Sequence, residues 1–405
     1  MPIALATPAP AAAAATARPV PAAPAGRGGR LPSIDILRGA VMAIMLVDHV
    51  RAYLTDLRFD PTDLARTSAP LFLTRWITHF CAPVFILLAG MSAWLAGRRR
   101  TRRELSVFLL TRGLWLVAVE FTVVSFAWYF NFEFPMGAFG QVIWAIGVSM
   151  VALAALVWLP LPAIAAVSLA MIGGHNLLDG VTPGSLGALG PVWTALHVPG
   201  PLGSTGIFVL YPLVPWIGVL AAGYVLAGWL ERRPEERPRR LLVLGAAITL
   251  GFVLLRAANV YGDPRPWAVR GDPVFTILSF LNVTKYPPSL LYLMVTLGPA
   301  LLALSWLERA PRWGTAWAAT FGQVAFFYYV VHLYVVHSLA VGLGMAQGFA
   351  PHEMRQLFLN LPAGYGVGLG PVWMVSAVVL VALYPLCRWY AGVKQRGRGW
   401  WWSYL

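Results

Sequence analysis

The residues best suited to chemistry lie near the end of a long apolar stretch, in the sequence Asp48-His49-Val50-Arg51. An imidazole can take a proton from an amine or a hydroxyl, or carry an acyl group transiently. On a helix, Asp48 and Arg51 are three residues apart and can form an ion pair, whereas His49 points about 100° away from Asp48. The pattern predicts an Asp–Arg pair that leaves His49 free to act as a base. The alternative is an ordinary polar helix end at a membrane interface.

Three other histidines lie in apolar surroundings. His79 occupies the first turns of the next apolar stretch, where a helix N-terminus favours a neutral ring that can accept a proton; the alternative is an interfacial histidine that bonds a neighbour. His332 and His337 are five residues apart in FFYYVVHLYVVH, so on a helix they diverge by roughly 140°. This spacing argues against a two-histidine metal site, and we predict no metal. His332, one turn after Tyr328, is the better candidate to line a polar cavity.

Three more ionisable residues are candidates for substrate or CoA binding, together with Arg51 and His332. Glu120 lies well inside an apolar stretch and needs an arginine or histidine partner unless it is neutral. Arg256 and Lys285 can form a cationic patch for phosphate, carboxylate or pyrophosphate, although anchoring to lipid headgroups would explain them equally well. The sequence contains no Gly-rich phosphate loop, GxSxG, HExxH or CxxC motif, and therefore gives no support to P-loop, hydrolase or zinc-protease readings.

The elements that must position these residues are membrane-spanning helices. Of the 405 residues, 59% are hydrophobic and 11% are charged, and apolar stretches of about twenty residues, each long enough to cross a bilayer, recur along the chain. We predict an all-α polytopic membrane protein of about ten spans, because only helices satisfy the backbone of such segments in lipid. The predicted spans are 34–54, 76–96, 106–128, 141–159, 161–176, 206–229, 239–257, 287–307, 316–345 and 371–391.

The distribution of charge predicts how these spans are oriented. The net charge is +14, and most of the 30 Lys and Arg residues fall on one side of the membrane if the N-terminus is cytoplasmic, as the positive-inside rule requires. An even number of spans returns the C-terminus to the cytoplasm. The basic residues are thus explained by topology and anionic lipid, and no nucleic-acid partner is predicted. Residues 1–30, rich in Ala and Pro, are predicted to be a disordered cytoplasmic tail, and residues 31–405 a single membrane domain.

With this orientation, the ionisable residues fall in one layer between the bilayer midplane and the outer surface. The longer connections, 55–75, 129–140, 177–205, 258–286 and 346–370, also lie outside. Within Asp272–Ser289 the run VFTILSFL is too short to span and predicts a short interfacial or re-entrant helix. The spans place the protein in the inner membrane, in contact with lipid, and the sequence indicates no oligomeric state.

At RLPSIDILRGAVMAIMLVDHVRAYL the sequence resembles the bacterial branch of the heparan-α-glucosaminide N-acetyltransferase-like membrane family. The resemblance extends over nearly the whole chain after residue 30, through THFCAPVFILLAGMSAWL, QVIWAIGVSM, YPLVPWIGVLAAGY, KYPPSLLYLMVTLGPALL, FFYYVVHLYVVH and WWWSYL. It implies an acyltransferase that uses cytoplasmic acetyl-CoA and acetylates an amine or hydroxyl on the far side. In characterised eukaryotic members, a histidine in the lumenal loop after the first core helix is held to be catalytic. The corresponding loop here, 55–74, has no histidine, and His49 and His79 flank it.

These observations give two hypotheses for function. In the first, the chain is a membrane acyltransferase with no bound cofactor, in which His49, or in second place His79, acts as base on a small-molecule or glycan acceptor and acyl-CoA is the co-substrate. Asp48 would then orient or charge-stabilise the histidine. In the second, the chain is a transporter or flippase in which the same polar layer forms a pathway for substrate or protons.

Overall fold

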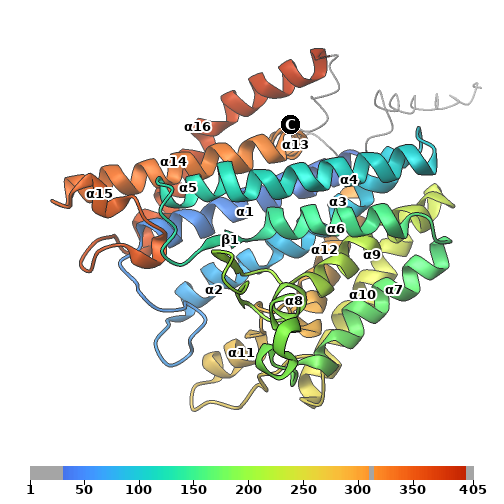
Figure 1. Cartoon of the computed structure of the whole chain (residues 1–405), viewed down its shortest axis with the longest axis horizontal. Coiled ribbons are helices and arrows are strands. Elements are labelled where there is room, and N and C mark those ends of the chain that lie inside the picture. Colours follow the sequence, from blue (N-terminus) through green and yellow to red (C-terminus); the bar gives the residue numbers. More distant parts are fainter. Residues whose placement is uncertain (1–30, 310–313, 398–405) are drawn as a thin grey trace, which may run out of the picture. The chain divides into compact units, whose positions relative to one another are not determined.

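The computed structural model describes residues 31–309 and 314–397, which fold mainly into helices (Figure 1). They belong to a compact unit that begins at Leu31. The predicted tail, residues 1–30, and the closing WWWSYL motif lie outside the described residues.

The helices and strands have the following bounds. The α-helices are α1 (Pro32–Leu54), α2 (Ala69–Ile77), α3 (Cys81–Gly97), α4 (Arg102–Val119), α5 (Ser125–Tyr129), α6 (Val142–Leu156), α7 (Leu161–Gly174), α8 (Gly190–Leu196), α9 (Leu213–Glu231), α10 (Arg237–Ala258), α11 (Pro273–Leu281), α12 (Leu290–Arg309), α13 (Ala316–Gln323), α14 (Ala325–Ala346), α15 (Pro351–Met354) and α16 (Leu369–Arg396). The 3₁₀ segments are η1 (Thr78–Phe80), η3 (His175–Leu178), η4 (Pro183–Leu189), η5 (Pro234–Glu236) and η7 (Phe358–Asn360), and η2 (Glu120–Val124) is a π-helix. The strands are β1 (Ala138–Gly140), β2 (Gly200–Pro201) and β3 (Ile207–Val209).

Eight helical segments in the described ranges are long and apolar enough to cross a membrane. This confirms the prediction of an all-α polytopic membrane protein. The other two predicted spans coincide with α1, which has 23 residues but carries four charged side chains, and with α6, which has only 15 residues. The total of ten spans and the cytoplasmic position of both termini stay predictions.

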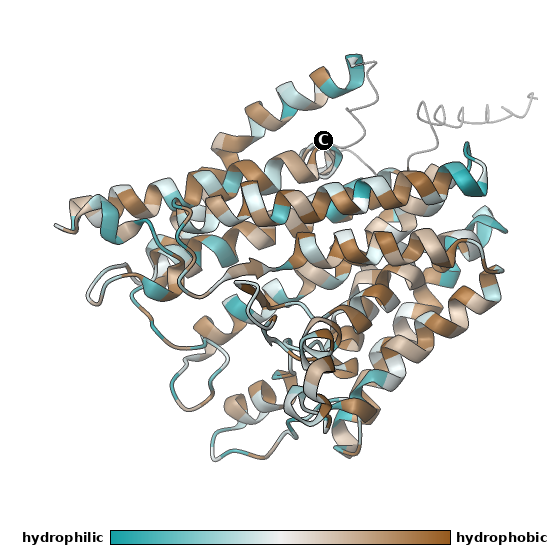
Figure 2. Cartoon of the chain, viewed as in Figure 1, coloured by the Kyte–Doolittle hydropathy of each residue, from teal (hydrophilic) through white to brown (hydrophobic). Residues whose placement is uncertain are grey.

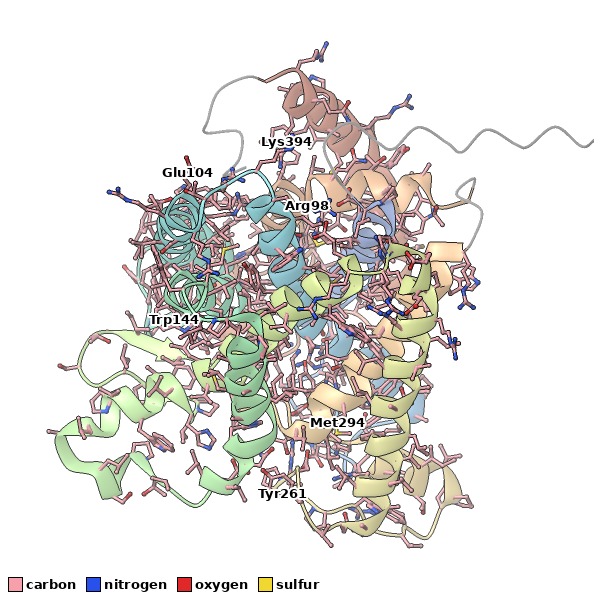
Figure 3. The ribbon with its side chains drawn as sticks, turned by 90° about the vertical axis from the view of Figure 1, so that its right-hand side faces the viewer. Arg98, Glu104, Trp144, Tyr261, Met294 and Lys394 are labelled. Carbon is pink, nitrogen blue, oxygen red and sulfur yellow. The ribbon has the colours of Figure 1, made fainter. Side chains whose placement is uncertain are left out.

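The outward faces of several helices are apolar, as contact with lipid requires. Figure 2 shows hydrophobic residues along the length of the helices and hydrophilic residues gathered in the turns, for example between α3 and α4. Figure 3 shows Arg98 and Lys394, both predicted to be cytoplasmic, in the upper part of the view, and Tyr261, predicted to be outside, at its lower edge. Large exposed apolar side chains on α10 and α16 include Leu242, Val243, Leu250, Leu254, Met374, Val378 and Val381.

The predicted ninth span, 316–345, is two helices. The chain leaves helical geometry at Val324, with φ −122° and ψ 33°, so that α13 ends at Gln323 and α14 begins at Ala325. Helix α13 packs directly against the backbone of α1, because a Cβ at Gly322 would overlap the carbonyl oxygen of Asp35. Close backbone contact through small residues is typical of membrane helices. The break lets α13 follow α1 while α14 carries the aromatic FFYYVVH sequence beside the C-terminal half of α1 (Figure 1).

The predicted sixth span begins too early. Residues Ile207–Val209 form strand β3, which pairs in parallel with β1 and antiparallel with β2, and α9 begins only at Leu213. Pro212 lies at the N-cap of α9 in an extended conformation, which suits the proline ring and ends the strand segment. The small sheet β1-β3-β2 thus joins two of the predicted outer connections. The predicted short helix between residues 272 and 289 is present as α11.

Candidate functional site

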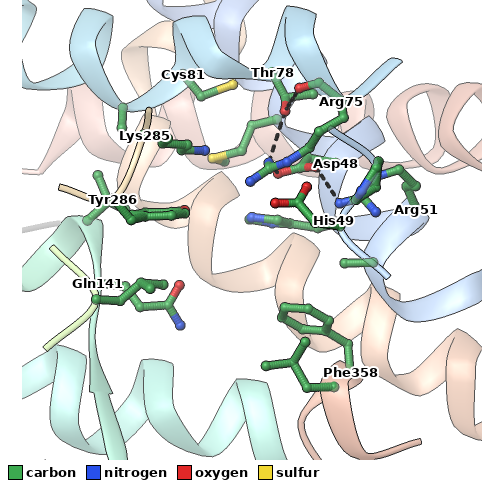
Figure 4. Close-up of a pocket in the computed structure, with 18 of the residues that line it drawn as sticks. Asp48, His49, Arg51, Arg75, Thr78, Cys81, Gln141, Lys285, Tyr286 and Phe358 are labelled. Carbon is green, nitrogen blue, oxygen red and sulfur yellow. Dashed lines mark hydrogen bonds and ion pairs between the residues drawn. The ribbon is translucent and has the colours of Figure 1, made fainter. Parts of the chain in front are cut away.

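A cavity of about 510 Å³ lies beside the C-terminal half of α1 (Figure 4). Its walls come from α1, α2 with η1, the beginning of α3, the end of α5, the β1–α6 junction, the loop before α12, α14 and η7. The cavity therefore joins segments from both halves of the sequence. Its lining includes Asp48, His49, Arg51, Arg75, Gln141, Lys285, Tyr286 and Tyr329.

Asp48 is held by two arginines. Arg51 Nη2 donates to Asp48 Oδ1 at 2.9 Å, which confirms the predicted pair between residues three apart on α1. Arg75 Nη1, from α2, donates to Asp48 Oδ2 at 2.6 Å. Both carboxylate oxygens are thus paired with cations, an arrangement that a carboxylate largely withdrawn from water requires. The pairing also joins the C-terminal end of α2 to α1.

His49 is oriented by His332 and not by Asp48. His49 Nδ1 lies 2.7 Å from His332 Nε2, and the two rings are stacked with an interplanar angle of 6°. The structure assigns no hydrogen bond between Asp48 and His49, because adjacent residues on a helix point about 100° apart. His332 of α14 thus takes the orienting role that the sequence hypothesis gave to Asp48, while the charge-stabilising role of Asp48 stays a prediction.

The hydrogen bonds of His332 determine which nitrogens carry protons. His332 Nδ1 lies 2.9 Å from the backbone carbonyl oxygen of Tyr328, and since a carbonyl only accepts, Nδ1 carries the hydrogen. In the neutral ring, His332 Nε2 is then an acceptor, so the hydrogen between the two rings belongs to His49 Nδ1. This leaves a lone pair on Nε2 of a neutral His49. Nε2 has no hydrogen-bond partner in the described part of the chain.

Aromatic rings hold His49 in place. The ring centroid of Trp128 lies 5.0 Å from that of His49 in an edge arrangement, and Tyr329 lies at 6.5 Å. Both residues line the cavity. Packing of this kind restricts the ring to one rotamer, as preorganised catalysis requires.

Lys285 and Tyr286 approach the same space from the loop before α12. Figure 4 shows Lys285 and Arg75 reaching toward each other from opposite walls, with Asp48 and His49 beside them. Gln141, at the N-cap of α6, lines another side of the cavity. The cavity therefore combines a candidate base with several hydrogen-bond donors.

Three of the predicted histidines do not line the cavity. His332 contacts His49 but is not among the lining residues, so the prediction that His332 lines the cavity is wrong. His79 lies in η1 with its ring 5.4 Å from that of Tyr292, and its Nδ1 is buried without a partner in the described residues. Both ring nitrogens of His337 lie 2.9 Å from backbone carbonyl oxygens, those of Ala127 and Met354. His337 therefore joins α14 to α5 and α15 and does not face the cavity.

Glu120 and Arg256 also lie elsewhere. Glu120 Oε2 accepts from the backbone N–H of Trp144 at 2.7 Å, in the first turn of α6, so its expected arginine or histidine partner is replaced by a helix N-terminus. Arg256 donates to the backbone carbonyls of four residues at 2.8–3.1 Å, namely Arg265, Ser279, Phe280 and Asn282. Neither side chain is among those that line the cavity. Arg256 holds the end of α11, and it does not join Lys285 in one cationic patch.

Sequence reasoning missed several cavity residues. Arg75 lies in an apolar run four residues before His79, and this spacing places both on one face of a helix. A charged residue in such a run is expected to face other helices and not lipid, and this was the signal that could have identified Arg75. Nothing in the local sequence marks Gln141, Tyr286 or Tyr329, because their roles depend on packing between distant segments. In the described ranges no cluster of three or more His, Cys, Asp or Glu side chains could hold a metal ion.

Comparison with known proteins identifies the family of this chain. Residues 30–255 match the family model described as heparan-α-glucosaminide N-acetyltransferase, catalytic. No curated protein matches the chain. The matched segment contains His49, Asp48 and Arg75 and covers more than half of the sequence. The chain therefore belongs to the heparan-α-glucosaminide N-acetyltransferase catalytic-domain family of membrane proteins.

Proposed function

We propose that this protein transfers an acetyl or related acyl group from an acyl-CoA to an amine or hydroxyl of a small molecule or envelope glycan. It would do so in the cell inner membrane, with the cavity open toward the outer side. The observation that carries the proposal is the His49–His332 pair, which leaves a lone pair on His49 Nε2 beside a cavity in a chain of this family. Family membership supports the type of reaction, and the geometry supports the choice of residue.

The transfer needs one base and one leaving group. The acceptor N–H or O–H attacks the thioester carbonyl, and His49 Nε2 takes the proton as the new bond to carbon forms. The tetrahedral intermediate then collapses, the C–S bond breaks, and the CoA thiolate leaves and takes up the proton. Through its bond to His49 Nδ1–H, His332 holds the ring in the tautomer that this step requires.

The charged residues around His49 would stabilise the negative charge that develops on the carbonyl oxygen. The guanidinium of Arg75 is the cation that Figure 4 shows beside the imidazole. Cations fixed in a site largely withdrawn from water stabilise an oxyanion better than mobile solvent does. Arg51 acts indirectly, because it holds Asp48, which in turn positions Arg75.

The proposal is tested with the purified chain reconstituted in liposomes. Acetyl-CoA carrying labelled acetyl is supplied together with a panel of amines, amino sugars and sugar alcohols, and free CoA is measured alongside labelled product. We expect equimolar CoA and acetylated product. Failure to transfer label to any acceptor, with no release of CoA, would refute acyl transfer.

The second candidate is a carrier that moves a polar solute or protons through the same layer. The observation that favours it is the number of ionisable groups buried near α1, since intramembrane charges often line transport pathways. An enzyme binds the thioester donor, whereas a carrier needs no CoA site. A rise in the midpoint of thermal unfolding on addition of CoA favours the enzyme, because a ligand that binds the native state stabilises it by mass action.

A further inference from the structure

We infer that the cavity contains a subsite for an oxyanion, built from Lys285 and Arg75, and that this subsite takes a phosphate or carboxylate group of the acyl acceptor. The identification of the ligand as the acyl acceptor rests on the proposed function, whereas the binding of an anion does not. It assigns the acceptor to the class of acidic molecules.

The charge of the cavity lining is unbalanced. Four cationic side chains line it, Arg51, Arg58, Arg75 and Lys285, against two carboxylates, Asp48 and Asp60. This leaves a formal excess of two positive charges. Like charges gathered at a site of reduced dielectric repel one another, and a bound anion relieves that repulsion.

Lys285 has no acidic partner of its own. Its side chain is 9% exposed, and neither a hydrogen bond nor an ion pair to its ammonium occurs in the described part of the chain. The nearest assigned contact is with the ring of Tyr286, 5.3 Å from Nζ. A buried ammonium needs a counter-charge, so a ligand is the natural candidate to provide one.

Arg75 offers the second set of donors. Its Nη1 is engaged by Asp48 and Thr78, at 2.6 and 3.3 Å, while the described residues provide no acceptor for its Nε and Nη2. The guanidinium has five N–H donors in a planar arrangement that allows bidentate hydrogen bonding to an oxyanion. Since Lys285 reaches toward it from the opposite wall (Figure 4), an oxyanion between the two would contact both cations.

The loop that carries Lys285 is fixed in place. The carboxylate of Asp263 accepts from the backbone N–H of Thr284 at 2.7 Å and from the hydroxyl of Ser289 at 2.7 Å, so that it binds the loop on both sides of Lys285. Asn282 Nδ2 donates to the carbonyl of Thr62, which ties the same loop to the segment after α1. A loop that is already held in one conformation loses little conformational entropy when a ligand binds its lysine.

The local electrostatics are consistent with an anion site. Burial alone would raise the pKa of the Tyr286 phenol, yet Lys285 and Arg75 hold that pKa below its usual value. An anionic form of a group in this space is thus favoured by its surroundings.

The position of the subsite favours the acceptor over the donor as the source of the anion. Besides the helices, the lining comes from residues 55–61, 210–211, 285–286 and 357–359, most of them in or beside connections predicted to lie outside the membrane. The donor is expected from the cytoplasm. An anion that enters through these connections would therefore belong to the molecule that receives the acyl group.

The test measures binding without turnover, as shifts in the midpoint of thermal unfolding of the full chain in detergent. Glucosamine 6-phosphate is compared with glucosamine, a pair that differs only in a phosphate group. CoA is compared with pantetheine, which lacks the phosphorylated adenosine diphosphate part of CoA. The proteins are the wild type, Lys285→Gln, Lys285→Arg and Lys394→Gln. Lys394, in the last turn of α16, does not line the cavity and provides a matched loss of one lysine.

We expect glucosamine 6-phosphate, but not glucosamine, to stabilise the wild type, Lys285→Arg and Lys394→Gln. In Lys285→Gln its affinity should fall about tenfold or more, the loss of a charge-assisted bond. Equal stabilisation of Lys285→Gln and the wild type, or none of either, would overturn the subsite. A different outcome is that CoA stabilises the protein in a way that depends on Lys285, while glucosamine 6-phosphate and pantetheine do not stabilise it. That result would assign the anion to the donor and overturn the acidic class of acceptor.

The two proposals can fail separately. Binding of glucosamine 6-phosphate that depends on Lys285, in a protein that releases no CoA, would support the subsite and refute acyl transfer. Release of CoA with neutral acceptors, by wild type and Lys285→Gln at equal rates, would support acyl transfer and contradict an acidic acceptor.

Discussion

Residues 30–255, which match the family model, and residues 256–397 beyond it contribute different parts of the cavity. The first region supplies the candidate base, His49, on a helix that runs through the protein. The second region supplies His332, which orients the base, and Lys285, the cation without an acidic partner. The candidate base thus lies within the matched region, while its histidine partner and one of the two cations of the proposed subsite come from outside it.

The largest effect should follow from His49→Ala. We expect turnover to fall by about 10²- to 10⁴-fold, the usual contribution of a general base, with protein level and CoA affinity nearly unchanged, because the substitution removes a transition-state interaction. His79→Ala, which alters a side chain outside the cavity lining, should cause a smaller loss. Steady-state release of CoA measures both. Full activity in both variants would eliminate the histidine mechanism.

Arg256→Gln separates stability from binding in the second region. The arginine satisfies four backbone carbonyls and is 1% exposed, and each buried acceptor left without a donor costs roughly 1–3 kcal/mol. We expect a markedly lower unfolding midpoint, with CoA and anion affinities of the folded fraction little changed. A variant as stable as the wild type that binds the anionic probes weakly would instead place Arg256 in the binding site.

His332→Ala tests whether the second region orients the base. Loss of one neutral hydrogen bond, worth roughly 1 kcal/mol, should lower kcat about 5-fold or more without a change in the KM for acyl-CoA. In the His49→Ala background, His332→Ala should have no further effect on kcat, because the imidazole that His332 orients is already absent. A double-mutant cycle measures this coupling. Additive losses would show that His332 acts only through packing.

The smallest effect concerns His197, in the matched region but remote from the cavity. Burial holds the pKa of His197 below its usual value, although Asp179, 3.1 Å away, opposes this shift. The unfolded chain therefore binds a proton below about pH 6.5 while the folded chain does not. The contribution of neutral His197 to stability is present above that pH and is lost as the pH falls. Unfolding midpoints of wild type and His197→Gln between pH 5 and 8 should converge toward the acid end. Parallel curves would exclude this linkage.

Local features of the candidate site were accessible from the sequence. Hydropathy located most of the spans, because a bilayer fixes the length of an apolar helix. The Asp48–Arg51 pair followed from helical spacing alone. In each case the decisive information lies within one segment of chain.

Contacts between distant segments could not be predicted in this way. The bond between His49 and His332 joins residues 283 positions apart, and helical spacing gives the face of a residue but not the helix that faces it. No proline in the sequence indicates the break at Val324, which places His332 opposite His49. The break depends on the packing of α13 against α1. Arg256 was predicted to bind substrate because it is a buried charge, yet its partners are backbone carbonyls of a loop whose path the sequence does not specify.

The central claim is that His49, oriented by His332, is the base in transfer from acyl-CoA. The most direct test measures release of CoA with the panel of acceptors by wild type, His49→Ala and His332→Ala, in parallel with thermal stabilisation of each protein by CoA. We predict that CoA stabilises all three proteins alike, while release is rapid in the wild type, reduced in His332→Ala and nearly absent in His49→Ala. Equal rates of release in wild type and His49→Ala, with equal stabilisation by CoA, would contradict the account.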